Sequence, residues 1–419
     1  MRLPLYGWLT SNAISFVGTR LSMLALPWFV LETTGSPTKT GLIALFELAP
    51  LVAMKIFGGP LIDRLGKRRV SITCDLASTL VVGLIPLLYA TGWLHFAALL
   101  VLVALAGALR GPGDDAKSAM IPELVASAGV PTERVTGLHS VVERTASMFG
   151  AAAAGVLIGV VGAANAIAID AVSFALCAVV LATTTARLPR PAGPANPAEV
   201  KDPTPYLGQL AEGWRYLRGD RVLLGIAIMV AFTNLIDAAA SSVLMPSWAQ
   251  THASAQTLGL LFAVMGGCSA IGSAIAAMIG NRIRRYPTYL IAFLITGLPR
   301  FAVIAIGAPL WVIFAVFAIA GVSSGFLNPI IGAIKFERIP APLVGRVTSL
   351  IAAGAWGLMP LGGLLGGTLI ATIGLTSAFA VLGIVYFVVT MFPAIDPTWK
   401  QIERRPDPAA SRLPAAAES

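Results

Sequence analysis

The chain divides into twelve apolar runs, each long enough to cross a membrane as a helix. A spanning helix needs about 20 predominantly apolar residues, and Gly, Pro or charged residues separate the runs. Because 57% of the residues are hydrophobic and only 12% are charged, the chain cannot build the water-facing surface of an ordinary soluble protein. We therefore predict an all-α integral membrane protein. Its spans are expected near residues 5–31, 39–61, 70–91, 95–117, 136–162, 163–186, 222–248, 256–281, 287–307, 309–334, 347–373 and 375–395.

Basic residues gather on one side of the predicted membrane. If the spans alternate in direction, the Lys and Arg residues between them fall at the end that holds both termini, and Lys39 falls at the other. Cytoplasmic loops carry an excess of Lys and Arg, so we predict a multi-pass protein of the cell membrane with both termini in the cytoplasm. The net charge of +9 lies in short clusters between apolar runs, and this pattern argues against a nucleic-acid partner.

The second half of the chain repeats the first. Chance matching among Gly-rich helices would produce isolated glycine pairs, but the halves also share Ile-Pro and Arg-Val-Thr elements. Two parallel repeats of six spans predict two pseudo-symmetric six-helix bundles. The aligned pairs include, at an offset of 218 residues, Gly41 with Gly259, Arg110 with Asn328, Lys117 with Lys335 and Pro122 with Pro340, and, at an offset of 212, Arg134 with Arg346, Gly155 with Gly367 and Gly162 with Gly374.

The repeat also sets the domain organisation. The N-terminal bundle is expected over 1–186 and the C-terminal bundle over 222–395. The stretch 187–221 between them is Pro-rich and then amphipathic, which is typical of a cytoplasmic linker followed by an interfacial helix. The stretch 396–419 is predicted to be a disordered cytoplasmic tail.

A turn after the second span carries a recognisable pattern. The stretch GGPLIDRLGKRRV, residues 58–70, packs one acid and four bases into seven positions. It resembles the loop 2–3 signature of the major facilitator superfamily, roughly G-x-L-x-D-R-x-G-x-[KR]-[KR]. The stretches EGWRYLR before span 7, IDAVSF in span 6 and LVGRVTS before span 11 resemble the branch that contains macrolide-efflux and siderophore-export proteins. The resemblance covers nearly the whole chain.

This resemblance implies a secondary active transporter that works by alternating access. The implied activity is proton-coupled export of an amphipathic small molecule, such as a drug, a macrolide-like compound or a siderophore. A metabolite importer or a lysolipid flippase of the same fold is the alternative within transport. A membrane receptor or scaffold that has lost transport is the alternative outside it.

Enzyme chemistry has no support in the sequence. It contains no Walker sequence, nucleophile elbow or nucleotide fingerprint at a usable position, so we expect no hydrolysis and no enzyme activity. His95, His139 and His252 share no ligand spacing, and we expect neither a metal nor a cofactor. The expected partners are a small-molecule substrate, protons and the lipid bilayer, and the expected state is a monomer.

The turn signature predicts a conformational latch. Gly59 would let span 2 approach a neighbouring helix, and Gly66 would allow a tight turn. Asp63 could accept hydrogen bonds from an adjacent helix N-terminus, and nearby bases could pair with acids such as Asp75. The resemblance implies that the latch joins the two halves when the transporter opens outward. A basic loop that serves only to set orientation is the alternative. The predicted latch residues are Gly59, Asp63, Arg64, Gly66, Arg68 and Asp75.

Several charged residues fall inside spans, where a central charge costs roughly 3 kcal/mol and each charge needs a partner or water. Asp237 is the acid of a C-half span and the near counterpart of Arg20 in the repeat, so it is a candidate proton carrier; a permanent pair with Arg300 is the alternative. Arg20 and Glu47 are predicted to pair, and Asp170 and Arg300 are expected to form static pairs. The proton-coupling candidates are Asp237, Glu47 and Glu143, and the cavity and charge-pair candidates are Arg20, Lys55, Arg110, Asn234 and Asn328.

Small residues at four-residue spacing predict close helix packing in spans 5 and 11. The expected packing positions are Gly150, Gly155, Gly159, Gly362, Gly363, Gly366 and Gly367.

Overall fold

The computed structural model describes residues 3–186, 206–279, 282–340 and 343–403. The regular structure of these residues is helical, which confirms the predicted all-α class. Within them, 12 helical stretches are long and apolar enough to cross a membrane, and this number confirms the predicted spans.

The N-terminal bundle contains six spans. A short helix, α3, forms the turn between the second and third spans, and α5 continues into α6 as one long span. The helices are α1 Leu3–Thr34, α2 Pro37–Phe57, α3 Gly59–Leu65, α4 Lys67–Ala90, α5 Phe96–Ala119, α6 Ile121–Ala128, α7 Thr132–Val161 and α8 Ala163–Thr184.

The C-terminal bundle follows the amphipathic helix α9 and contains the other six spans. Three of these spans are broken into consecutive segments. The elements are α9 Tyr206–Gly219, α10 Arg221–Ala239, the π-helix η1 Ala240–Leu244, α11 Met245–His252, α12 Ala255–Ile279, α13 Arg285–Thr296, α14 Leu298–Ala305, α15 Leu310–Arg338, α16 Val344–Gly357, α17 Met359–Ile373, α18 Leu375–Ile395 and the 3₁₀-helix η3 Pro397–Glu403.

The tight turns at one end of the molecule, which we call the glycine-turn end, contain glycines with positive φ. A positive φ suits glycine because it has no Cβ. Gly162 and Gly374 have the same φ of 82° at equivalent turns of the two halves, as their alignment at an offset of 212 requires. We call the other end, which carries α3, α6, α9 and η3, the basic end. The glycines of these turns are Gly35, Gly92, Gly162, Gly307 and Gly374.

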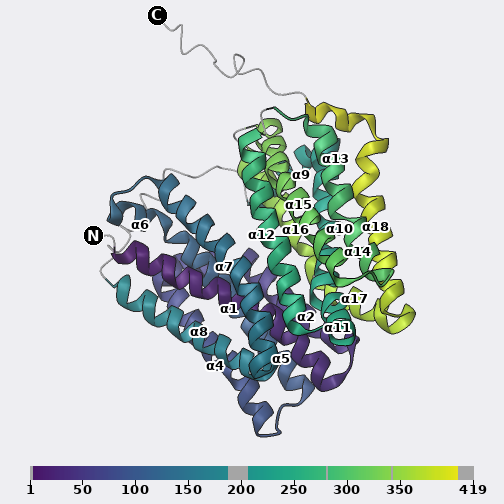
Figure 1. Cartoon of the computed structure of the whole chain (residues 1–419). Coiled ribbons are helices and arrows are strands. Elements are labelled where there is room, and N and C mark those ends of the chain that lie inside the picture. Colours follow the sequence, from purple (N-terminus) through teal and green to yellow (C-terminus); the bar gives the residue numbers. More distant parts are fainter. Residues whose placement is uncertain (1–2, 187–205, 280–281, 341–342, 404–419) are drawn as a thin grey trace, which may run out of the picture.

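The two bundles meet through two equivalent helix pairs near the glycine-turn end, α2 with α17 and α7 with α12. A Cβ added to Gly367 would collide with the backbone of Pro37, and a Cβ added to Gly155 would collide with the backbone of Ala255. Residues 37 and 255 are related by the offset of 218, so the two contacts are pseudo-symmetric copies. Figure 1 shows the bundles diverging from this region toward the ends that carry α6 and α9.

The segment after the last span differs from the prediction of a disordered tail. Residues 397–403 form η3, and Trp399 is 1% exposed. The indole packs against the Tyr289 ring in a tilted arrangement, with ring centroids 5.7 Å apart. The Glu403 carboxylate accepts hydrogen bonds from the backbone N–H groups of Arg285 and Tyr286, at 3.3 and 3.0 Å. The tail therefore caps the first turn of α13, and the rest of it lies outside the described residues.

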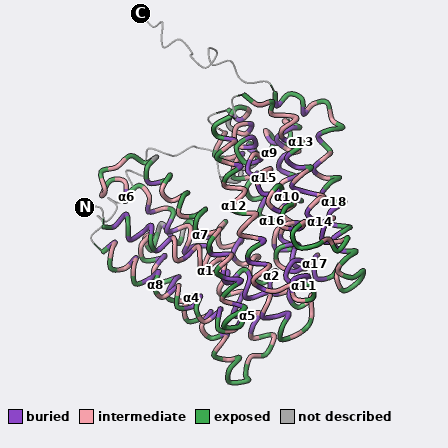
Figure 2. The backbone as a smooth tube through the Cα atoms, in the orientation of Figure 1, coloured by how far each residue is buried: buried purple, intermediate pink, exposed green. Residues whose placement is uncertain are grey.

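Exposed residues follow the outer faces of many spans, and buried residues lie where helices pack together (Figure 2). Large apolar side chains such as Leu80, Val160 and Ile384 are exposed. A surface of this kind suits a bilayer, because lipid tails replace water around it. The fold thus agrees with a multi-pass membrane protein.

Candidate functional site

A cavity of about 620 Å³ lies between the two bundles. Its N-half wall comes from α1, α2 and α7, and its C-half wall from α10, η1, α12, α14 and α17. The wall combines charged side chains with apolar ones, among them Met23, Phe262, Met265 and Met359. It can therefore surround a ligand that has both polar and apolar parts.

Broken helices position the C-half wall. Pro246 has no backbone N–H, and the five-residue π-helix η1 directly precedes it; proline cannot continue the regular hydrogen-bond ladder of a helix. The ninth span breaks at Gly297, before Pro299, and the eleventh at Leu358, before Pro360. These breaks lie beside the cavity residues 237, 300 and 359, as is common for binding sites built on discontinuous helices.

Asp237 and Arg300 form an ion pair in the cavity wall. The Asp237 side chain is 42% exposed, whereas the Arg300 side chain is 10% exposed. The Arg300 guanidinium also lies over the rings of Phe301 and Tyr386, at 4.9 and 5.1 Å from their centroids. In this conformation Asp237 therefore has a fixed cationic partner, which is the alternative that the sequence left open.

The predicted pair between Arg20 and Glu47 is not present in this structure. Glu47 pairs instead with Arg110, at 3.7 Å between Oε1 and Nη1. Arg20 donates a hydrogen bond to the hydroxyl of Ser147 at 3.1 Å. Arg20 and Glu47 both line the cavity. They lie at similar depth in α1 and α2, but their charged groups are not in contact.

Glu143 lines the cavity from α7, next to Arg144 in the sequence. Both residues are exposed. Asn234 also lines the cavity, and its amide donates to the Ala355 carbonyl at 2.9 Å, joining α10 to α16. Asn328 is exposed on α15 and does not line the cavity.

Lys55 lies outside the cavity wall. It pairs with Asp115 at 2.9 Å, and both side chains are about one-third exposed, 31% and 37%. Arg110 also lies behind the wall, where it has a second carboxylate, that of Asp114, at 3.8 Å. Lys55 and Arg110, both predicted as cavity and charge-pair candidates, thus pair with separate acids outside the cavity wall.

The turn signature makes its contacts within the N-terminal bundle. Arg68 donates to the Thr185 hydroxyl at 3.0 Å and to the Ala182 carbonyl at 2.6 Å, both at the C-terminal end of α8. The backbone at Gly66 has a φ of 87°, which fits the tight turn. A Cβ on Gly59 would meet no neighbouring atom, so the expected close helix approach is absent there. Arg64 is exposed, and the side chain of Asp63 lies outside the described residues.

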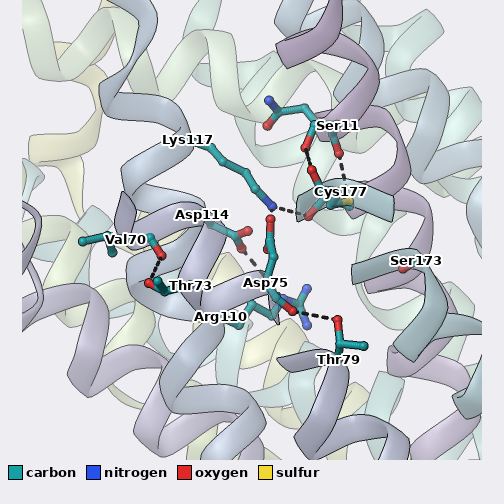
Figure 3. A network of polar contacts seen from close by, with 12 residues as sticks. Ser11, Val70, Thr73, Asp75, Thr79, Arg110, Asp114, Lys117, Ser173 and Cys177 are labelled. Carbon is teal, nitrogen blue, oxygen red and sulfur yellow. Dashed lines mark hydrogen bonds and ion pairs between the residues drawn. The ribbon is translucent and has the colours of Figure 1, made fainter. Parts of the chain in front are cut away.

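Asp75 pairs with Lys117 and not with the turn, contrary to the prediction. The Lys117 ammonium lies 3.0 Å from the Asp75 carboxylate and 3.2 Å from the Ser15 hydroxyl, and the two charged side chains are 1% and 4% exposed (Figure 3). The sequence analysis placed Lys117 at the end of the span predicted over 95–117 and named no partner for it. The one signal was its position at the end of a predicted span, because a charge inside a span needs an internal partner.

The glycines of spans 5 and 11 lie at helix contacts. Gly155 and Gly159 face α12, and Gly363 and Gly367 face α2, so these four lie between the bundles. The other three lie within a bundle: Gly150 faces α1, while Gly362 and Gly366 face α10 and η1. Small residues let helix backbones approach closely at each position.

Helix α9 is fastened to the basic end of the C-terminal bundle. Glu212 pairs with Arg346 at 2.5 Å, and the Tyr216 hydroxyl donates to the Arg338 carbonyl at 2.5 Å. Asp220 accepts from the backbone N–H of Val222 at 3.0 Å and caps α10. Partial burial, followed by the charge of Asp220, raises the pKa of the Tyr216 phenol above its usual value.

Comparisons with known proteins agree with this architecture. A family model described as "Major Facilitator Superfamily" matches residues 8–251 and 227–417. The chain is 29% identical over 386 residues to the multidrug efflux pump Tap of Mycobacterium tuberculosis, covering 91% of each chain. It is 22% identical over 390 residues to the staphyloferrin A transporter of Staphylococcus aureus, covering 91% of this chain and 93% of the relative.

Solved structures share the fold. The chain resembles the nucleoside transporter NupG, with a TM-score of 0.72 and 14% identity over 93% of this chain and 98% of the other. It also resembles a bacterial homologue of the iron transporter ferroportin in an inward-facing state, with a TM-score of 0.68 and 14% identity over 95% and 98% of the two chains.

Proposed function

The chain belongs to the major facilitator superfamily of transporters, and we propose that it is a proton-coupled exporter of amphipathic small molecules. The observation that carries this proposal is the cavity between two pseudo-symmetric bundles, which are closely packed at the glycine-turn end and diverge toward the basic end. Such a cavity can face either side of a membrane if the two bundles rock about it.

The charge distribution supports an orientation in which this cavity opens to the cytoplasm. The basic end carries clustered Lys and Arg residues, so by the positive-inside rule it faces the cytoplasm. The present conformation then admits ligands from the cytoplasm, which is the loading state of an exporter. The name of the relative Tap, a multidrug efflux pump, supports the same direction.

The chemistry of the wall favours an amphipathic ligand. The cavity of about 620 Å³ has the size of a drug-binding site, which is typically about 300–1,000 Å³. Met23, Met265 and Met359 offer flexible, polarisable contacts that adapt to ligands of different shapes. Arg20, at the same wall, contacts only a hydroxyl and the Met23 sulfur among the described residues, and it can bind polar groups of a ligand.

Closure of the basic end would complete the cycle. The loop that contains Asp63 and Arg64 lies at that end of the N-terminal bundle. We propose that it contacts the C-terminal bundle in the opposite conformation, when the glycine contacts between α2 and α17 open. Arg68, which is already fastened to α8, would hold the loop in position for that contact.

Reconstitution tests this function. Purified protein in proteoliposomes would be given an imposed pH gradient and ethidium, a lipophilic cation, as the probe. Ethidium should concentrate on the side with more protons, and a protonophore should abolish the accumulation. Accumulation equal to that of protein-free liposomes, with ethidium and with a panel of neutral amphiphiles, would argue against proton-coupled export.

A further inference from the structure

Asp170 of α8 is a buried carboxyl group that lies outside the cavity wall. Its residue is 0% exposed. One carboxyl oxygen is hydrogen-bonded by Ser22 of α1, and the other accepts a hydrogen bond from the Ser173 hydroxyl at 3.1 Å. Gly18 faces the same point, and a Cβ there would collide with Asp170 and Ser173. The sequence predicted a static ion pair for Asp170, but the structure gives it hydroxyl partners.

No Lys or Arg of the described residues lies within ion-pair distance of Asp170. An ionised carboxylate buried in this way is costly, because burial removes its hydration and no counter-charge within ion-pair distance replaces it. A hydroxyl can donate or accept a hydrogen bond, so Ser22 can serve a protonated carboxyl as well as an ionised one. The neutral acid is therefore the less costly form at this position.

The charged side chains that the structure describes on the helices packed against α8 have other partners or are exposed, as Glu32, Arg69 and Arg134 are. On α1, Arg20 donates to Ser147, and on α4, Asp75 is paired with Lys117. Toward the basic end of α4, Lys67 pairs with Glu123 and Arg68 contacts Thr185. On α7, His139 stacks on Trp8 with centroids 5.0 Å apart, whereas Glu143 and Arg144 line the cavity.

Arg110 of α5 is the candidate cation for Asp170. Arg110 and Glu47 are the charged groups that act on Asp170 electrostatically. Arg110 holds its acids at 3.7 and 3.8 Å, whereas a close charge-assisted hydrogen bond measures about 2.7–2.9 Å. The Arg110 guanidinium is thus only weakly paired with Glu47 and Asp114, and Asp170 is an acid without a cationic partner.

We propose that Asp170 is a proton-binding site, occupied in this conformation and emptied when Arg110 leaves Glu47 and pairs with Asp170. The proton leaves the carboxyl group for water in the cavity, and Arg110 keeps its charge throughout. Glu47 lines the cavity, so a cationic group of a ligand that pairs with Glu47 would free Arg110. Binding a cation and releasing a proton are then coupled by the movement of one side chain. This inference rests on the proposed export function.

Infrared spectroscopy of the full-length protein tests the site without transport. A protonated carboxyl group has a C=O stretching band that an ionised one lacks. At neutral pH, Asp170→Asn should remove such a band from the wild-type spectrum, whereas the matched control Asp115→Asn should not, because Asp115 is paired and partly exposed. Ser173→Ala keeps the acid and should shift the band, since it removes one hydrogen bond. Identical spectra for wild type, Asp170→Asn and Ser173→Ala would overturn the proposal.

Proton release tests the coupling, with ethidium as the probe in lightly buffered detergent solution. The wild type should release protons as ethidium binds, while Asp170→Asn and Arg110→Gln should bind ethidium with the release lost. Release from Asp170→Asn equal to that of the wild type would overturn the proposal. A band assigned to Asp170 in a protein that shows no gradient-driven transport would reject proton-coupled export and leave the site standing. Gradient-driven transport with no such band would reject the site alone.

Discussion

Gly41 of α2 and Gly363 of α17 meet so closely at the glycine-turn end that a Cβ on either would collide with the backbone of the other. The same contact recurs at the second interface, where a Cβ on Gly259 would collide with the backbone of Ala151. Gly41 and Gly259 differ by 218 residues, and Ala151 and Gly363 by 212. Both offsets are those of the sequence repeat. The two contacts are therefore pseudo-symmetric copies, and we propose that together they form one gate.

Gly41→Ala should open this gate. Overpacking a tight contact costs about 1–3 kcal/mol, so the equilibrium should shift toward the opposite conformation by roughly 5- to 150-fold. Labelling of Ser140→Cys in the cavity by a membrane-impermeant thiol reagent, added at the basic end, should slow accordingly. Gly332→Ala is the matched control, because a Cβ there meets no atom. Equal labelling rates in the two variants would show that the contact does not control the gate.

Glu47 should couple to Arg110 and not to Arg20. Charges in contact show interaction free energies of about 0.5–3 kcal/mol in double-mutant cycles, and Glu47 lies 3.7 Å from Arg110. We expect Glu47→Gln and Arg110→Gln to be strongly non-additive in thermal stability. The cycle of Glu47→Gln with Arg20→Gln should be additive to within about 0.5 kcal/mol. The opposite ranking of the two cycles would contradict the observed pairing.

Asp237→Asn should destabilise the protein, because it leaves the charge of the nearly buried Arg300 without its partner. Removing one member of a buried pair lowers the free energy of unfolding by about 3–5 kcal/mol. Because Asp237 is partly exposed, we expect a loss of about 3 kcal/mol or less. The double variant Asp237→Asn with Arg300→Gln should recover part of the loss. Thermal unfolding in detergent would measure all three variants. A double variant less stable than either single variant would contradict the claim that the unpaired charge of Arg300 causes the loss.

Trp399→Ala should lower the free energy of unfolding by about 3 kcal/mol. Truncating a buried Trp costs about 3–5 kcal/mol of stability, and Trp399 is 1% exposed. Trp311→Ala is the control, because Trp311 is 74% exposed and should change thermal stability little. If both substitutions were equally mild, the packing of η3 against the C-terminal bundle would be disproved.

The spans and the repeat could be predicted because they depend on local properties of the sequence. They can be recognised without knowledge of tertiary contacts: the length of each apolar run, the turn glycines such as Gly162 and Gly374, and the constant offset of the repeat. The membership of the cavity was predictable in part: Arg20, Glu47 and Asp237 lie in its wall, whereas Lys55, Arg110 and Asn328 do not. Helical depth and family resemblance were sufficient to locate them.

The pairing of charges could not be predicted from depth alone, because it depends on how each helix is rotated about its axis. Arg20 and Glu47 face one cavity, yet the partner of Glu47 is Arg110 on a third helix. Lys117 and Asp75 escaped detection for the same reason. Trp399 and Glu403 follow a stretch of polar composition, and only their tertiary contacts show that it is ordered.

Cation movement and proton movement are coupled in the proposed mechanism, and the reverse reaction is a direct test of this coupling. Proteoliposomes loaded with ethidium and a pH-sensitive dye would be diluted into ethidium-free medium with no pH gradient. As ethidium leaves, coupled exchange should draw protons inward and acidify the lumen, and Asp170→Asn should remove the acidification while ethidium still leaves faster than from protein-free liposomes. Protein-dependent loss of ethidium from wild-type proteoliposomes with an unchanged luminal pH would contradict the account.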